Sequence, residues 1–129
     1  MFQLQYLDHI AIRVRDVEKS ALWYEEVLGL KRVKPREWGA FPIMMLAGKT
    51  GIALFPAKTN NPKILPEGDW LVPFHFAFQV SNQEFEKVKQ HFEKKNIAIE
   101  FQDLIHFHSI FISDPDNYKI EITTQVKLY

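Results

Sequence analysis

The chain has 129 residues, with 16 Lys and Arg balanced by 16 Asp and Glu, no Cys and 47% apolar residues. A chain of this length can bury a core of its own as one domain, without disulfides or a structural metal. The lack of Cys excludes thiolate nucleophiles, Cys-ligated zinc and iron–sulfur clusters, and it favours the cytoplasm. The balanced charge gives no basic surface for nucleic acid, and no apolar run of about 18 residues predicts a membrane span.

An internal repeat divides the chain into two halves. The segment at residues 9–14, His-Ile-Ala-Ile-Arg-Val, returns at residues 75–80 as His-Phe-Ala-Phe-Gln-Val. In each copy large apolar residues alternate with smaller or polar ones, as in a half-buried strand, and a helical pattern follows. We therefore expect two modules with the same architecture.

The first half continues from its opening strand into a helix and three further strands. Asp16 is placed to cap a helix that runs to about residue 28, and Gly29 is placed to end it. Further strands are predicted near residues 31–34, 41–47 and 52–56. The first half therefore has the order βαβββ.

The second half repeats this order. Ser81 and Glu84 form a capping-box pattern ahead of a helix that Asn96 ends. Strands are predicted at residues 98–101, 107–113 and 118–124. We expect a single α+β domain made of module 1 at about 5–57, a connector or lid at about 58–72, and module 2 at about 73–125.

The alternation within the strands assigns side chains to two faces of each sheet. The bulky apolar side chains of each strand are expected under the helix. The smaller and more polar side chains that alternate with them then lie on the opposite, concave face. In the opening strands that set comprises His9, Ala11, Arg13, His75, Ala77 and Gln79. In the last strand it includes Glu121 and Thr123, and Ala53 holds the position of Glu121 in the first half.

The turns decide which residues face the last strands. A tight four-residue turn at 114–117 places Ile110 opposite Glu121 and His108 opposite Thr123. His108 then shares the concave face as a candidate general acid or base, although a solvated strand end explains a histidine there equally well.

The first half has an apolar wall in place of these polar groups. The same reasoning about its turn sets Leu46 opposite Ala53 and Met44 opposite Phe55. The candidate substrate-binding residues are Met44, Leu46, Ala53, Phe55, Arg13, Gln79 and Thr123. Core packing is the alternative role of the apolar residues, and mutual pairing is the alternative role of Arg13 and Gln79.

Two histidines and one carboxylate on one face suggest a metal site. His9, His75 and Glu121 would form a facial ligand set that leaves positions open for a substrate or water. A carboxylate among apolar neighbours on an inward face needs a cation or hydrogen-bond donors. The sequence thus predicts a divalent metal, with Fe, Mn, Zn, Ni and Mg all open.

Two segments resemble the signatures of a known family. Residues 7–12, Leu-Asp-His-Ile-Ala-Ile, lead to Trp-Tyr-Glu-Glu-Val-Leu-Gly-Leu at 23–30, and Ser-Asp-Pro-Asp-Asn-Tyr-Lys-Ile-Glu-Ile closes the pattern at 113–122. Together with the repeat, they resemble the vicinal oxygen chelate superfamily of glyoxalase, bleomycin resistance and extradiol dioxygenase proteins. Asn117 stands where that family usually has Gly, and Asn tolerates a left-handed turn.

The resemblance implies a cupped, barrel-like mixed sheet with helices on its outer face and a divalent metal in its cavity. It implies His9, His75 and Glu121 as the metal ligands, and it places a fourth ligand of the glyoxalases at Ala53. An alanine there argues against a faithful glyoxalase. The remaining triad is similar to that of extradiol dioxygenases and thiol-transferring fosfomycin-resistance enzymes.

The leading hypothesis is a metal-dependent enzyme, a lyase, isomerase or dioxygenase of the glyoxalase-like kind, that chelates a small oxygenated organic substrate. Two alternatives remain open, a noncatalytic protein that sequesters a small molecule or antibiotic, as bleomycin-resistance members do, and a purely structural dimer module. We expect a homodimer, formed either with one cavity in each chain or by exchange of modules between chains.

Overall fold

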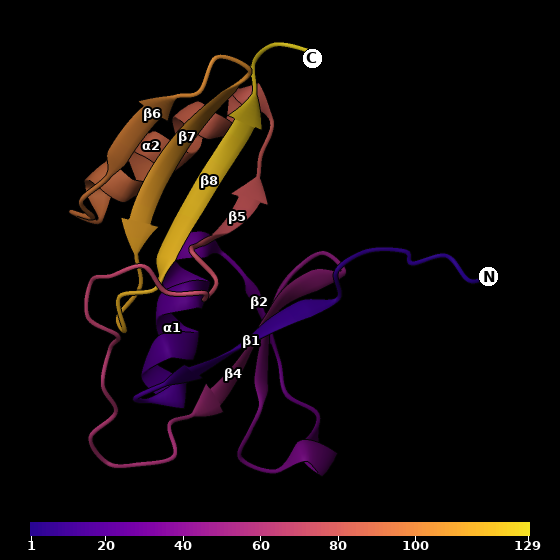
Figure 1. Cartoon of the computed structure of the whole chain (residues 1–129), viewed down its shortest axis with the longest axis vertical. Coiled ribbons are helices and arrows are strands. Elements are labelled where there is room, and N and C mark those ends of the chain that lie inside the picture. The colour runs from indigo at the N-terminus through magenta and orange to yellow at the C-terminus, as the bar shows by residue number, and fades with distance from the viewer. The chain divides into compact units, whose positions relative to one another are not determined.

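The computed structural model describes residues 1–129 and divides the chain into two compact units, Met1–Lys63 and Ile64–Tyr129 (Figure 1). Residues 57–75, which contain the boundary between the units, include no helix or strand.

The first unit is a four-stranded sheet with one α-helix. Its strands lie in the order β1-β4-β3-β2, with β1 parallel to β4 and the other neighbours antiparallel. The elements are β1 (His9–Val14), α1 (Val17–Leu28), β2 (Lys31–Val33), a short 3-10 helix (Arg36–Trp38), β3 (Ile43–Ala47) and β4 (Thr50–Pro56).

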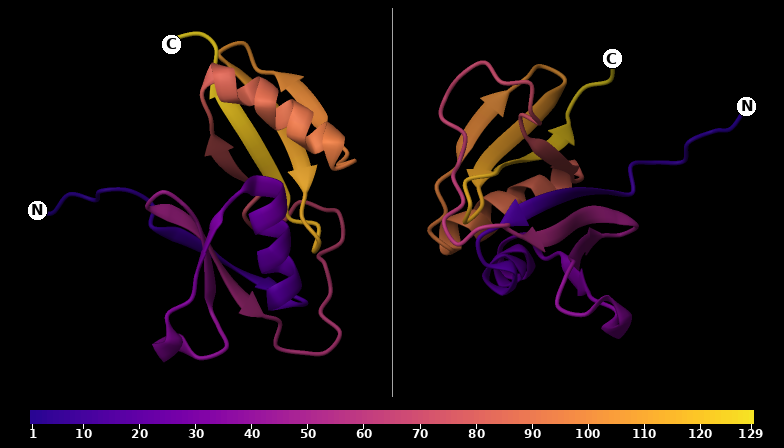
Figure 2. Two further views of the ribbon diagram at one scale, coloured as in Figure 1. Left: turned by 180° about the vertical axis from the view of Figure 1, so that it is seen from behind. Right: turned by 60° about the horizontal axis from the view of Figure 1, so that its bottom comes forward.

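The second unit repeats this arrangement in the order β5-β8-β7-β6, again with one parallel pair, between β5 and β8. Its elements are β5 (Phe76–Gln79), α2 (Asn82–Lys94), β6 (Glu100–Asp103), β7 (Phe107–Ser113) and β8 (Lys119–Gln125). Figure 1 views this sheet from the face opposite α2, and the left view of Figure 2 shows α2 lying across its other face. The predicted α+β class and the repeated βαβββ order are confirmed.

Both helices begin and end as their sequences predict. The Asp16 side chain accepts a hydrogen bond from the backbone N–H of Lys19 at 3.0 Å, and Gly29 ends α1 in the left-handed conformation at φ 65°. The Ser81 hydroxyl accepts from the N–H of Glu84 at 3.2 Å, and Asn96 follows α2 with φ 56°. Each unit therefore contains its own start and stop signals.

The core of each unit lies between its helix and its sheet. Tyr24 of α1 and Phe92 of α2 are among the largest fully buried side chains. The alternate residues that pack beneath them are aliphatic: Ile12, Val14, Ile52 and Leu54 in the first sheet, and Ile110, Ile112, Ile120 and Ile122 in the second. Burial of this set assigns the other alternate set to the opposite, helix-free face.

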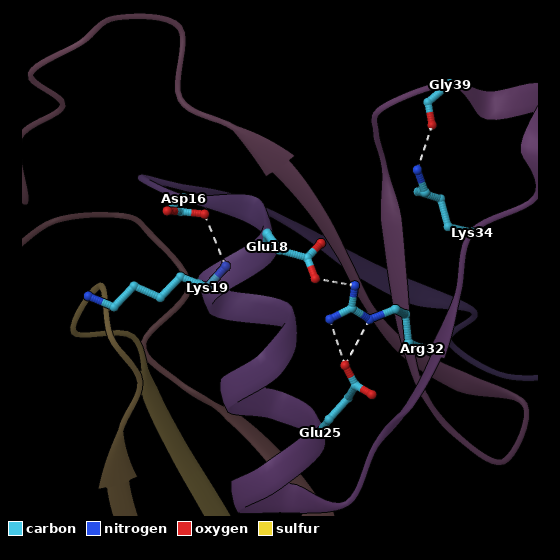
Figure 3. Close-up of polar contacts among 7 residues, drawn as sticks. All are labelled: Asp16, Glu18, Lys19, Glu25, Arg32, Lys34 and Gly39. Atoms are coloured by element: carbon cyan, nitrogen blue, oxygen red, sulfur yellow. Dashed lines mark hydrogen bonds and ion pairs between the residues drawn. The ribbon is translucent and has the colours of Figure 1, made fainter.

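A charged network ties β2 to α1 (Figure 3). The Arg32 guanidinium donates to Glu18 at 2.6 Å and to Glu25 at 2.8 Å, and these two carboxylates lie about two turns apart on one face of the helix. The hydrogen bond to Glu18, more than any other contact, raises the pKa of Arg32. The network therefore fixes the helix against the edge strand of the first sheet.

Both helices are too short and too polar to cross a bilayer.

Candidate metal centre

The parallel pairing of β5 with β8 places Glu121 on the helix-free face of the second sheet. Glu121 pairs with Ala77, and Thr123 pairs with Gln79. On the other side of β8, Phe111 of β7 lies opposite Glu121 and Ser109 lies opposite Thr123. Because directly paired residues share a face, the concave assignment of Ala77, Gln79, Glu121 and Thr123 agrees with this register.

The predicted pairing of β7 with β8 was wrong by one residue. His108 lies opposite Thr124 rather than Thr123, and its ring centroid is 6.4 Å from that of Phe85 in α2. A one-residue shift in register turns every side chain of a strand to the other face. His108 is therefore on the helix face, away from Glu121, and the structure does not support its candidate role as acid or base.

The cause of the shift is the connection between β7 and β8. Ser113 pairs with Lys119, so five residues link the strands where four were expected. The Asp114 carboxylate accepts hydrogen bonds from the backbone N–H groups of Asp116 and Tyr118 at 2.9 and 2.8 Å, and Asn117 takes a left-handed φ of 70°. The left-handed conformation expected for Asn117 is confirmed, whereas the length of the turn was wrong.

In the first sheet the predicted partners were also wrong, but the predicted face was right. Ala47 pairs with Thr50 across a two-residue turn, so Met44 lies opposite Ala53 and Leu46 lies opposite Gly51. This shift amounts to two residues, which preserves the face of every side chain. Met44, Leu46 and Ala53 therefore share one face, as the apolar wall requires.

His75 and Glu121 form the polar centre of the second unit. His75 Nε2 lies 3.0 Å from Oε1 of Glu121, and the side chain of Glu121 is only 12% exposed. The rings of Phe74 and Phe111 stand edge-on to the imidazole, with centroids 4.9 and 5.5 Å away. The other ring nitrogen, Nδ1, is buried without a hydrogen-bond partner, so Nε2 carries the polar interactions of this histidine.

In the first unit, His9 lies at the start of the edge strand β1. Its Nδ1 is 2.8 Å from a carboxylate oxygen of Asp8, and its side chain is 43% exposed. A carboxylate on Nδ1 fixes the ring tautomer with Nε2 as the nitrogen available to a metal, as is common for histidine ligands. His9 pairs with Gly51 of β4, which adds no side chain beside the imidazole.

The donor set in these units suits a divalent metal ion. A divalent ion would be held here by Nε2 of His75 and a carboxylate oxygen of Glu121, both of which are common metal ligands in proteins, and these atoms already lie 3.0 Å apart. A carboxylate can accept about four hydrogen bonds, and Glu121 has Ser109 and His75 as its partners. A buried carboxylate with spare acceptor capacity beside an imidazole favours a cation.

Neither unit alone gathers three His, Asp or Glu side chains for a metal. His9 belongs to the first unit, and His75 and Glu121 belong to the second. The complete triad therefore draws its ligands from both units and stays a prediction.

Three of the remaining predicted site residues have side-chain partners within their own units. Arg13 donates from Nη1 to the carbonyl oxygen of Pro56 at 2.9 Å, and Phe55 contacts Phe41 with ring centroids 6.2 Å apart. Thr123 lies 2.9 Å from Ser109 through their hydroxyl oxygens. The substrate-binding roles of Arg13, Gln79, Thr123 and the apolar wall stay predictions.

Ser109 is the residue that the sequence analysis missed. It is fully buried on β7, and its hydroxyl lies 3.0 Å from Oε2 of Glu121. The shorter turn expected from the sequence placed His108 in this position, opposite Thr123. The first Asp of the Asp-Pro-Asp-Asn segment can accept two backbone hydrogen bonds, which is compatible with the longer turn but does not exclude the shorter one.

Comparison with known proteins agrees with the duplicated fold. Residues 6–122 match the model of the Glyoxalase/Bleomycin resistance protein/Dioxygenase superfamily. A glutathione transferase FosA of Serratia marcescens is 29% identical over 92% of this chain and 80% of its own. A metallothiol transferase FosB of Lysinibacillus sphaericus is 31% identical over 94% and 83%.

A solved structure supports the fold itself. The crystal structure of a glyoxalase/dioxygenase from Nostoc punctiforme is 23% identical, with a TM-score of 0.79 over 95% of this chain and 92% of that one. The resemblance noted in the sequence is confirmed, because the family model covers both βαβββ units from before β1 into β8. The chain belongs to the Glyoxalase/Bleomycin resistance protein/Dioxygenase superfamily.

Proposed function

We propose that this protein is a divalent-metal-dependent thiol transferase that acts on a small oxygenated electrophile, with His9, His75 and Glu121 as the metal ligands. The observation that carries the proposal is the 3.0 Å approach of His75 Nε2 to Glu121 Oε1 on the helix-free face. Relatives at 29% and 31% identity are named as a glutathione transferase and a metallothiol transferase, which favours thiol transfer over the other reactions of the superfamily.

The missing fourth ligand also favours this reaction class. Ala53 occupies in the first sheet the position that Glu121 occupies in the second, since Ala53 pairs with Ala11 and Glu121 with Ala77. A three-ligand site leaves more positions for substrate oxygen and water than a four-ligand site does. The protein thus departs from the four-ligand pattern of glyoxalases.

A bound divalent ion would supply Lewis acidity that stabilises negative charge developing on a substrate oxygen. The residues of this chain would then hold and orient the reactants. Met44, Leu46 and Phe55 would contact the apolar portion of the substrate, while Arg13 and Gln79 would bind its polar groups. Exclusion of water by the apolar wall would strengthen these polar interactions.

We take an epoxide as the electrophile to test, because its ring oxygen could occupy an open position on the metal. A thiol loses its proton to solvent, and the thiolate sulfur forms a bond to one ring carbon while the bond from that carbon to the ring oxygen breaks. The oxygen leaves with the electron pair, stays on the same molecule and takes a proton from water. The product is a hydroxy thioether, and the step needs no oxidant or reductant.

The test is a thiol-addition assay on metal-stripped protein that has been reloaded with Mn(II), Fe(II), Ni(II) or Zn(II). Glutathione or L-cysteine would be mixed with a panel of small epoxides, and the adducts would be measured by mass spectrometry. The expected result is an adduct that requires the metal, the thiol and Glu121. Glu100→Ala is the matched control, because Glu100 is an exposed carboxylate on β6 of the same sheet.

The assay separates this proposal from the noncatalytic alternative. Binding of a small molecule without turnover, under every metal condition, would favour sequestration and contradict thiol transfer. Turnover of diketone-derived substrates or catechols without thiol addition would assign the chain to another reaction of its superfamily. We further propose that the protein forms a homodimer. We also propose that it is located in the cytoplasm, where a chain without Cys is common.

A further inference from the structure

We propose that Ser109 is a positioning residue that fixes the orientation of the Glu121 carboxylate, with Thr123 supporting it. The proposal rests on the proposed function, because it concerns Glu121 as a metal ligand. Its evidence lies wholly within the second unit, where Ser109, Glu121 and Thr123 occupy neighbouring positions on β7 and β8.

The three side chains form a continuous hydrogen-bonded chain. The Ser109 hydroxyl oxygen is 3.0 Å from Oε2 of Glu121 and 2.9 Å from the hydroxyl oxygen of Thr123. Ser109 is fully buried, and Glu121 and Thr123 are largely shielded from solvent. Buried polar groups that are all satisfied hold one arrangement firmly, since each alternative leaves a group without a partner.

The number of protons that these side chains can donate fixes the direction of each hydrogen bond. An ionised carboxylate only accepts hydrogen bonds, and a serine hydroxyl has a single proton to donate. The Ser109 proton is therefore directed to Oε2 of Glu121, and the Ser109 oxygen accepts from the Thr123 hydroxyl. The alternative acceptor for Thr123, the carbonyl oxygen of His108, is farther away at 3.4 Å.

The two carboxylate oxygens of Glu121 therefore have different partners. Ser109 engages Oε2, while Oε1 faces His75 Nε2 at 3.0 Å. The hydroxyl thus stops the carboxylate from rotating and leaves Oε1 as the oxygen presented on the side of the imidazole. Partners of this kind orient ligands before a metal binds, and their loss commonly weakens metal affinity by about 10–100-fold.

The first sheet has no such arrangement, which argues that the hydroxyls accompany the carboxylate rather than the fold. Ala53 takes the place of Glu121 there, and the register of β3 with β4 brings Pro42, just before β3, to the place of Ser109. Phe55 takes the place of Thr123, two residues farther along β4. A βαβββ unit therefore forms without a serine and a threonine at these positions.

The experiment measures Mn(II) affinity by calorimetric titration of the metal-stripped full chain, alongside its stability in urea. Ser109→Ala is expected to weaken Mn(II) binding by about 10–100-fold, and Thr123→Val by less, because Ser109 can still donate to Glu121 without Thr123. Ser113→Ala is the matched control, as Ser113 is exposed at the end of the same strand. It should bind Mn(II) as the wild type does.

Ser109→Thr keeps the hydroxyl and should retain Mn(II) affinity within a few-fold of the wild type. If Ser109→Ala fails to fold, the comparison of Ser109→Thr with Thr123→Val carries the test, and a weaker affinity in the former overturns the proposal. Wild-type affinity in a folded Ser109→Ala protein, with loss of binding in Glu121→Ala, overturns the role of Ser109 and leaves the metal site intact. Wild-type affinity in Glu121→Ala contradicts the metal site itself.

Discussion

Ala53 and Glu121 occupy the same position in two separate sheets. Ala53 pairs with Ala11 on one side and Met44 on the other, whereas Glu121 pairs with Ala77 and Phe111. Both are buried residues on the helix-free faces of their sheets. Only the second copy therefore carries a carboxylate at this position, which limits the proposed metal site to three protein ligands.

A carboxylate at position 53 should destabilise the metal-free protein. Ala53→Glu would bury a charge between Ala11 and Met44, without the hydroxyl donor that Glu121 has in Ser109. We expect a loss of about 2–4 kcal/mol in the free energy of unfolding, measured by urea denaturation in the presence of a chelator. Ala47→Glu, at an exposed end of β3, should cost less than about 1 kcal/mol, and an equal loss in both variants would contradict the burial argument.

Gly51 should tolerate a side chain poorly, because a Cβ there would run into the backbone carbonyl oxygen of Met45. Backbone cannot move aside as a flexible side chain can, so Gly51→Ala should lower the thermal unfolding midpoint by many degrees or prevent folding. Gly29→Ala is the comparison, since its Cβ would enter open space and only the left-handed φ of 65° opposes it, at about 1 kcal/mol. If Gly29→Ala lowered the unfolding midpoint more than Gly51→Ala, β3 and β4 would have to be farther apart at Gly51.

The network around Arg32 should contribute modestly to stability. Arg32→Met removes the charge-assisted hydrogen bonds to Glu18 and Glu25 while keeping most of the aliphatic stem. We expect a loss of about 1–2 kcal/mol at low salt, smaller in 1 M NaCl because ions screen the partly exposed carboxylates. Lys34→Met is the control, since Lys34 bonds only the Gly39 carbonyl oxygen at 3.1 Å. Equal, salt-independent losses in both variants would exclude the ion pairs as the cause.

His108 should have no part in metal binding. Its ring lies against Phe85 of α2 and Phe101 of β6, so His108→Ala removes packing on the helix face. We expect Mn(II) affinity within about twofold of the wild type and a stability loss of about 1 kcal/mol. A tenfold drop in affinity in the folded variant would mean that His108 reaches the face of Glu121, as a shorter turn between β7 and β8 would allow.

The sequence predicted the duplicated modules well, because local signals define them. Each of these signals depends on a few neighbouring residues. They are the alternation around His9 and His75, the helix caps at Asp16 and Ser81, and the helix stop at Gly29. Glu121 was assigned to the right face for the same reason, since its own strand alternates clearly.

Strand register was harder to predict, because it depends on how a turn closes. A two-residue error between β3 and β4 left Met44 and Leu46 on the expected face, whereas a one-residue error between β7 and β8 exchanged His108 for Ser109. Two backbone N–H groups donate the decisive hydrogen bonds to the Asp114 carboxylate, and an Asp at this position also suits a shorter turn. Site residues on β7 could therefore not be assigned from alternation alone.

The most direct test of the account is the metal content of the purified protein, followed by Mn(II) titration of the stripped form. We expect about one ion per chain in the wild type, and loss of binding in His9→Ala, His75→Ala and Glu121→Ala, with His91→Ala on α2 as the unaffected control. Loss in the His75 and Glu121 variants but not in His9→Ala would restrict the site to the second unit. Full binding in all three ligand variants, or no uptake by the wild type, would contradict the metal centre.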